Sequence, residues 1–124
     1  MTIESAYRAR AALNKISHSA MPAKTAYKIS KLSNFLKDDA NFYTERLSQI
    51  IEQYGEKDES GEPVISGSGY KIQKDKTDEC AAAIKELSEI EATVPDTKIY
   101  LSELDGVELS PDDIAAIYAF IEED

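Results

Sequence analysis

The chain has 124 residues, 42% hydrophobic and 31% charged, with 24 acidic and 14 basic side chains. This length allows one domain with a real core, and the composition is that of a folded, helix-rich protein rather than a disordered one. No apolar run is long enough to span a membrane, the start shows no secretory leader, and the single Cys80 cannot form an internal disulfide, so we expect a cytoplasmic protein.

Charge is distributed unevenly along the chain. Residues 1–37 carry seven cationic side chains and one acid, whereas residues 94–124 carry nine acids and one lysine. We expect the basic N-terminal helices to dock against, or simply to balance, the acidic C-terminal segment. The alternative is that one of these patches meets a charged partner.

A weak apolar stripe predicts a first helix over residues 5–18, capped by Ser5 or Thr2. A polar turn follows it. Pro22 then suits the first turn of the next helix, where its missing N–H costs nothing. The first two helices should therefore form a hairpin.

Residues 22–54 are predicted to form one long helix of about 50 Å. Its seam keeps the 3,4 spacing of a heptad pattern: Ala26, Ile29, Ser33, Leu36, Ala40, Tyr43, Leu47, Ile50 and Tyr54. A second apolar row beside it, Leu32, Phe35, Phe42 and Ile51, makes the stripe too wide for one partner helix. We expect Gly55 to end the helix in a left-handed turn.

Residues 55–74 are predicted to be a charged linker followed by a small β flap, with short apolar segments on either side of a Ser-Gly-Ser-Gly turn. A third helix should cover residues 75–94, with Asp75 as its cap. Its seam repeats the 3,4 spacing: Cys80, Ala83, Leu87, Ile90 and Val94. Its length matches the second half of the long helix, which predicts an antiparallel coiled-coil pair joined through the flap.

The last segment, residues 95–124, is predicted to be an acidic strand–helix module. Residues 97–101 are a strand candidate, Asp105 and Gly106 indicate a turn, and Ser110 with Pro111 is a strong helix start. The apolar face of this last helix is Ile114, Ile117, Tyr118 and Ile121. The expected fold is mainly α in a single domain over residues 1–124, with a helical hairpin over 1–54.

No pattern of residues indicates catalysis, a metal site or a cofactor. His18 is the only histidine and has no acid at a useful spacing, while Cys80 has acidic neighbours that oppose a reactive thiolate. Acid pairs occur throughout the chain and single out no site. The basic face of the long helix has too few cationic side chains, and too little arginine among them, for a nucleic-acid surface. We therefore expect no enzyme, no cofactor, no direct nucleic-acid binding and no membrane contact.

Several stretches of the chain together resemble a family of small uncharacterised proteins encoded by tailed phages and prophages. They are residues 12–16 and 21–31, residues 54–58 before the Gly-rich flap, and residues 101–104 and 107–114 near the end. The resemblance implies a phage origin, and hence the cytoplasm of an infected bacterial host. It supplies no catalytic residue and no mechanism, and leaves incorporation into the virion open.

Two functional hypotheses follow. The first is a non-enzymatic phage accessory or assembly protein that acts through protein–protein contacts, as a homo-oligomer or with another phage or host protein. Its candidate contact residues are the second apolar row, Leu32, Phe35, Phe42 and Ile51. The alternative is an acidic inhibitor of a host defence or nucleic-acid-binding enzyme, acting through Asp112, Asp113, Glu122 and Glu123.

Overall fold

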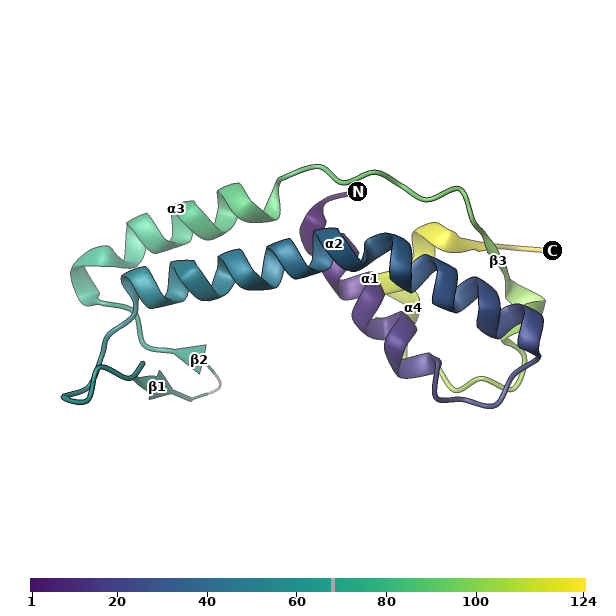
Figure 1. Ribbon diagram of the computed structural model, residues 1–124, viewed down its shortest axis with the longest axis horizontal. Helices are drawn as coiled ribbons and strands as arrows, with labels where there is room; N and C mark the ends of the chain where they lie inside the picture. Colours follow the sequence, from purple (N-terminus) through teal and green to yellow (C-terminus); the bar gives the residue numbers. More distant parts are fainter. Residues whose placement is uncertain (68) are drawn as a thin grey trace.

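A computed structural model describes residues 1–67 and 69–124 of the chain. The molecule is elongated and mainly helical, as the sequence predicts, and α2 (Ala23–Tyr54) runs along most of its long axis (Figure 1). In the described part of the chain, no helix combines the length and the apolar character needed to cross a membrane.

Helix α1 (Ile3–Ile16) begins two residues earlier than predicted, because Thr2 is its cap and accepts a hydrogen bond from the Ser5 backbone N–H at 3.1 Å. It forms the expected hairpin with α2. Its inner face is built largely from Ala6, Ala9 and Ala12, all buried. Small side chains allow neighbouring helices to approach closely, so these alanines let α1 pack between two layers of the fold.

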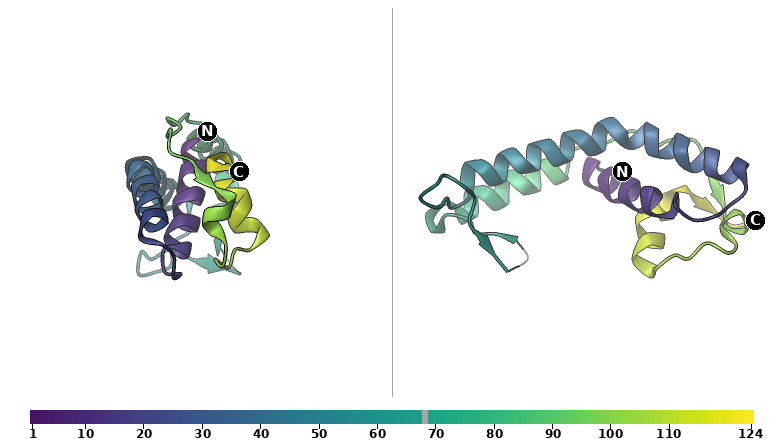
Figure 2. Two further views of the ribbon diagram at one scale, coloured as in Figure 1. Left: turned by 90° about the vertical axis from the view of Figure 1, so that its right-hand side faces the viewer. Right: turned by 60° about the horizontal axis from the view of Figure 1, so that its bottom comes forward.

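Helix α1 lies in the middle of a three-layer lobe, with α2 on one side and the C-terminal module (residues 95–124) on the other (Figure 2). The core of this lobe gathers side chains from all three layers: Ala6, Ala9, Ala12, Leu13, Ile16, Ile29, Leu32, Leu36, Ile99, Leu104, Ile117 and Phe120. The hairpin is therefore completed by residues from the far end of the chain.

The C-terminal module is built from short elements. Strand β3 (Ile99–Tyr100) leads into the 3-10 helix η2 (Leu101–Leu104), then α4 (Pro111–Ile117), the 3-10 helix η3 (Tyr118–Phe120) and strand β4 (Ile121–Glu122). Strands β3 and β4 pair in parallel, with Ile99 opposite Ile121. The predicted start of the last helix is confirmed, because the Ser110 hydroxyl accepts from the Asp113 N–H at 3.1 Å and the Asp113 carboxylate accepts from the Ser110 N–H.

The predicted apolar face of this last helix is partly wrong. Helix α4 ends at Ile117 and tightens into η3, which rotates the following side chains. Tyr118 is consequently 73% exposed, and Phe120, which the periodicity did not single out, is fully buried in its place.

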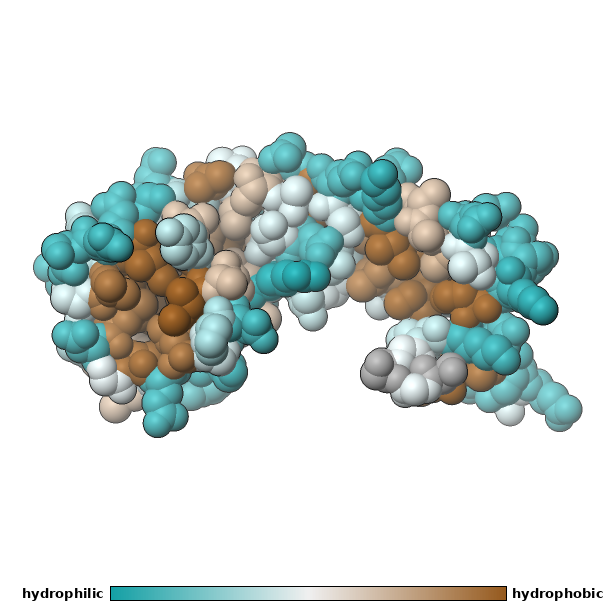
Figure 3. All heavy atoms as spheres, turned by 180° about the vertical axis from the view of Figure 1, so that it is seen from behind, coloured by the Kyte–Doolittle hydropathy of each residue, from teal (hydrophilic) through white to brown (hydrophobic). Residues whose placement is uncertain are grey.

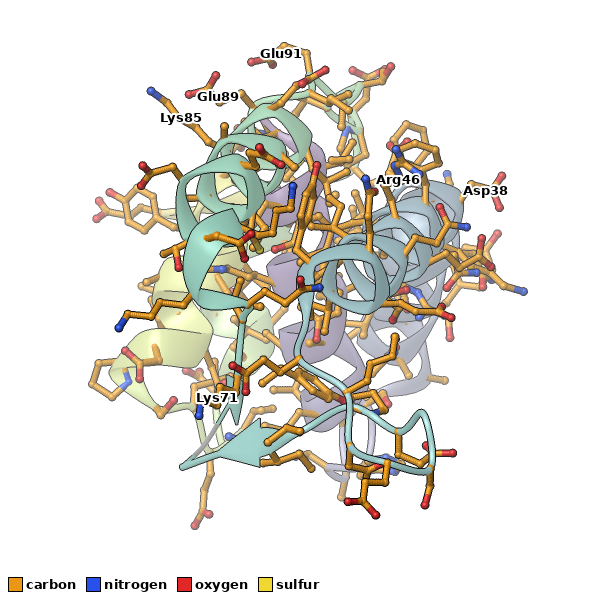
Figure 4. The ribbon with its side chains drawn as sticks, turned by 90° about the vertical axis from the view of Figure 1, so that its left-hand side faces the viewer. Asp38, Arg46, Lys71, Lys85, Glu89 and Glu91 are labelled. Carbon is orange, nitrogen blue, oxygen red and sulfur yellow. The ribbon has the colours of Figure 1, made fainter. Side chains whose placement is uncertain are left out.

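At the other end of the molecule, α3 (Thr77–Ser88) packs antiparallel against the second half of α2. A second small core fills this contact: Ile3, Tyr43, Ile50, Cys80 and Leu87. Figure 4 shows this end of the molecule. Lys85, Glu89 and Glu91 lie on the outer side of α3 and of the segment that follows it, and Asp38 and Arg46 lie on the outer side of α2. With twelve residues in α3, fewer than two heptads, the contact is a short antiparallel helix pair.

Helix α3 is shorter at both ends than predicted. Asp75 lies in the 3-10 turn η1 (Lys74–Lys76) and does not cap α3. Past Ser88 the chain pairs with the N-terminal residues, since the Ile3 N–H donates to the Ile90 carbonyl and the Ala92 N–H to the Met1 carbonyl, each at 2.8 Å. This backbone pairing ends the helix, so Ile90 and Val94 lie outside it and are exposed.

The β flap is confirmed as an antiparallel pair of β1 (Ile65–Ser66) and β2 (Gly69–Tyr70). Ser68 of the predicted turn lies outside the described residues. The flap is anchored to the end of α2, because the Glu56 N–H donates to the Lys71 carbonyl at 2.8 Å and the Gln73 N–H to the Tyr54 carbonyl at 2.9 Å.

Gly55 ends α2 but does not adopt the predicted left-handed conformation. Its φ of −72° and ψ of 149° are extended, which directs the chain into the flap. Glycine is needed here for space, because a Cβ at this position would lie 2.5 Å from the Ile51 carbonyl oxygen.

We expect Gly55→Ala to lower the free energy of unfolding by about 1–3 kcal/mol, because the added Cβ forces the end of α2 away from the flap. Urea unfolding monitored by circular dichroism measures this change. Gly69→Ala is the matched control, since nothing lies within 4 Å of a Cβ built there. Equal stability of the two variants would contradict the steric role of Gly55.

Candidate functional site

The predicted second apolar row does not form one surface. Leu32 is fully buried in the core of the lobe, so the expectation that it meets a partner is wrong. Phe35 and Phe42 lie two turns apart on the outer side of α2 and are exposed, whereas Ile51 is half-buried near the flap residues Pro63 and Tyr70. Each residue advances an α-helix by about 100°, so Ile51 lies roughly 180° around the axis of α2 from Phe42 and does not share a face with it.

The predicted docking of basic helices against the acidic module is confirmed by two ion pairs. Lys15 of α1 lies 3.0 Å from the Asp113 carboxylate, and Lys28 of α2 lies 2.6 Å from that of Glu103. Asp113 is therefore occupied within the fold and is not free for a partner, contrary to prediction. Its bond to Lys15 and the capping of α4 lower its pKa.

Glu103 joins three groups of the lobe. Besides Lys28, it accepts from the Tyr100 backbone N–H at 3.1 Å and from the Thr25 hydroxyl at 3.4 Å. These bonds, the one from Lys28 foremost, lower the pKa of Glu103. They also explain why Thr25 faces inward, whereas Ala26 of the predicted seam is exposed.

An apolar groove opens on the outer side of the C-terminal module. Its volume is about 410 Å³, and Figure 3 shows it as a hollow surrounded by apolar side chains. We call it the C-terminal groove, and its lining residues are Leu101, Leu104, Asp105, Val107, Leu109, Ile114, Tyr118, Ile121 and Glu123. The groove exists because Ile117 and Phe120 fill the core, which leaves Ile114 and Tyr118 on the outer face.

The segment that forms the groove is strongly acidic, and Asp105 and Glu123 are part of the groove lining. Residues 101–124 contain eight acids and no lysine, arginine or histidine. Glu103 and Asp113 are neutralised by lysines, and Asp124 accepts from the backbone N–H and hydroxyl of Ser102. Among the described residues, no cation lies within 4 Å of the remaining five acids: Asp105, Glu108, Asp112, Glu122 and Glu123.

The other hollows and reactive side chains of the molecule are weaker candidates for a functional site. A larger hollow of about 730 Å³ lies between α1 and α4, but the Lys15–Asp113 ion pair and alanines form much of its lining. Cys80 is buried, and this burial raises the pKa of its thiol, which opposes reactivity. His18 is exposed in the turn after α1, and within residues 1–67 and 69–124 no three potential metal ligands converge.

The groove was not predicted from the sequence, although the sequence contains an apolar pattern that indicates it. Leu101, Leu104, Val107, Leu109 and Ile114 form a dense apolar series that follows neither a helical nor a strand period. Such a series inside an acid-rich segment indicates either a core built from irregular backbone or an apolar surface. In this chain it supplies both, since Leu104 is buried and Leu101 and Ile114 are exposed.

A scan against models of protein families gives no match for this chain, and neither do comparisons with curated proteins and with solved structures.

We expect Glu103→Gln to lower the free energy of unfolding by about 1 kcal/mol at about pH 7, because Lys28 loses its ionic partner. A carboxyl whose pKa is lower in the folded state stabilises the fold above its unfolded pKa, and this contribution disappears as the pH falls through the folded pKa. The difference from wild type should therefore be smaller at about pH 3.5 than at about pH 7.

Urea unfolding at the two pH values measures this effect. Glu108→Gln is the matched control, because Glu108 is exposed and forms no ion pair in the described structure. A difference between Glu103→Gln and wild type that does not change with pH would contradict the ionic role of Glu103.

Proposed function

We propose that the chain is a non-enzymatic protein-binding module and that the C-terminal groove is its binding site. The observation that carries this proposal is the open apolar groove on the outer side of the C-terminal module. Clustered exposed apolar side chains with a polar rim are typical of surfaces that bind other proteins. Leu101, Ile114 and Tyr118 supply three large apolar side chains to such a contact.

The chemistry of the groove favours binding over catalysis. Its lining offers two carboxylates and one tyrosine as its ionisable groups, and none of the described lining residues is a serine, cysteine, histidine or lysine. A nucleophile activated by a neighbouring base, which most covalent and acid–base mechanisms require, has no candidate there. Asp105 and Glu123 are better suited to attract a cationic partner.

The wider role we propose is that of an accessory or assembly protein of a tailed phage, working in the cytoplasm of the infected bacterium. The motif resemblance supports the phage origin. The partner is another phage or host protein, or a second copy of the chain. Phe35 and Phe42, exposed on the outer side of α2, are the residues that support self-association.

A second candidate is inhibition of a host defence or nucleic-acid-binding enzyme by the acidic surface. The acids without an ion pair, Asp112, Glu122 and Glu123 among them, support it. This candidate requires binding that is lost when these three acids are neutralised and kept when Ile114 is replaced. The groove proposal requires that binding is lost when Ile114 is replaced, so the Ile114 variant separates the two.

We expect peptides selected from a displayed random library by the wild-type protein to lose about tenfold in affinity for Ile114→Asn, because a polar side chain then occupies the groove. Ile114 is 41% exposed, so the substitution leaves the core intact. Fluorescence anisotropy with the selected peptides measures the loss.

Phe42→Asn is the matched control, because Phe42 is 52% exposed on α2, outside the C-terminal groove. It should leave these affinities unchanged. Selected peptides that bind wild type and Ile114→Asn equally well, or a library that yields no binder, would refute the assignment of the groove.

A further inference from the structure

Resting on the proposed function, we infer that the occupant of the C-terminal groove is a basic amphipathic helix of a partner protein. Its apolar face enters the groove and its lysines or arginines meet the surrounding acids. Three properties of the site lead to this class of partner: the irregular backbone of its walls, the distribution of its charge, and the burial of this chain's own apolar helix faces.

The walls of the groove favour contact through side chains rather than through backbone hydrogen bonds. Strands β3 and β4 are two residues long and pair with each other, so an added strand would gain few backbone bonds there. The rest of the wall is helix α4, 3-10 turns and loop. A helix needs no backbone partners and presents apolar side chains at positions i, i+3 or i+4, and i+7 to such a groove.

The charge of the site selects a cationic helix. Lys15, Lys28 and Lys98 are directed at the C-terminal module, but each is engaged inside the fold, with Asp113, Glu103 and the Ala119 carbonyl respectively. Of the five acids that lack an ion pair, Asp105 and Glu123 line the groove, and Glu108 lies in the sequence between the lining residues Val107 and Leu109. An anionic lipid, a fatty acid or a phosphate would be repelled there, whereas lysine or arginine at the rim of a bound helix would be attracted.

A second copy of this chain does not supply such a helix. The basic part of α2 carries Lys24, Lys28 and Lys31, but the apolar side chains of the same part, including Ile29 and Leu32, are buried in its own core. The exposed Phe35 and Phe42 lie further along α2, with Asp38 and Asp39 between them, so that part of the helix is not cationic. A free apolar face combined with lysines or arginines therefore points to another protein.

Three synthetic peptides of about 16 residues test this inference. One places Leu at helical spacing among Lys, the second keeps this spacing with Glu in place of Lys, and the third has the composition of the first with Leu and Lys alternating. Fluorescence anisotropy at low salt should show that the first binds about tenfold more tightly than the other two, and that salt weakens its binding.

Variants of the protein then locate the binding. Ile114→Asn should weaken the helical Lys peptide about tenfold, and Phe42→Asn should leave it unchanged. Tyr118→Ser is a second groove variant, should Ile114→Asn fail to fold by circular dichroism. The triple variant Asp105→Asn, Glu108→Gln, Glu123→Gln should weaken binding about fivefold to tenfold, because three rim charges are lost.

The triple variant Glu45→Gln, Glu52→Gln, Glu59→Gln is the matched control, because these acids are exposed and unpaired in the described structure but lie on α2 and in the linker. It should leave the affinity unchanged.

Equal binding of the Glu peptide or of the alternating peptide would overturn the inference, and so would binding that both triple variants weaken alike or that no groove variant weakens. Sedimentation showing groove-dependent dimers of the protein alone would favour a second copy and overturn it as well. If library peptides occupy the groove but the helical Lys peptide does not, the inference is wrong and the proposed function stands. If neither binds there, both are wrong.

Discussion

The apolar stripe of α2 has to be covered along its whole length, and the rest of the fold follows from the way this is done. Helix α1 covers the first half and α3 covers the second, which produces two separate cores on one helix. Neither α1 nor α3 is long enough to cover the stripe alone. Ile117 and Phe120 of the C-terminal module complete the first core from the other side of α1. The position of this module therefore also depends on covering the apolar stripe of α2.

The charges of the lobe are separated into an inner and an outer set. Lys15 and Lys28 reach across the layers to Asp113 and Glu103. Partial burial makes such pairs worth more than fully exposed ones, so the inner set helps to dock the module. Over residues 101–124 the outer set consists of acids alone. These acids contribute little to the fold, and they supply the charge on which the proposed preference for a cationic partner rests.

The sequence predicts α2 and the flap well, because the evidence for each is local and repeated. The seam of α2 holds its spacing over about thirty residues, and the flap is marked by a Gly-rich turn between apolar segments. The errors arise where a distant segment decides the outcome. Pairing of Ile90 with Ile3 ends α3 early, and pairing of Ile99 with Ile121 sets which side of α4 faces inward. The groove depends on that last choice, and the sequence indicates it only as an apolar series that follows neither a helical nor a strand period.

The ion pair between Lys15 and Asp113 joins residues that are 98 positions apart. Contacts that enclose so much chain form late in folding, because the closure of a long loop costs conformational entropy before any contact rewards it. The contact between α2 and α3 encloses far less chain, so closing it costs less conformational entropy. The walls of the groove belong to the module that the longer closure holds in place, so the groove depends on contacts between the two ends of the sequence.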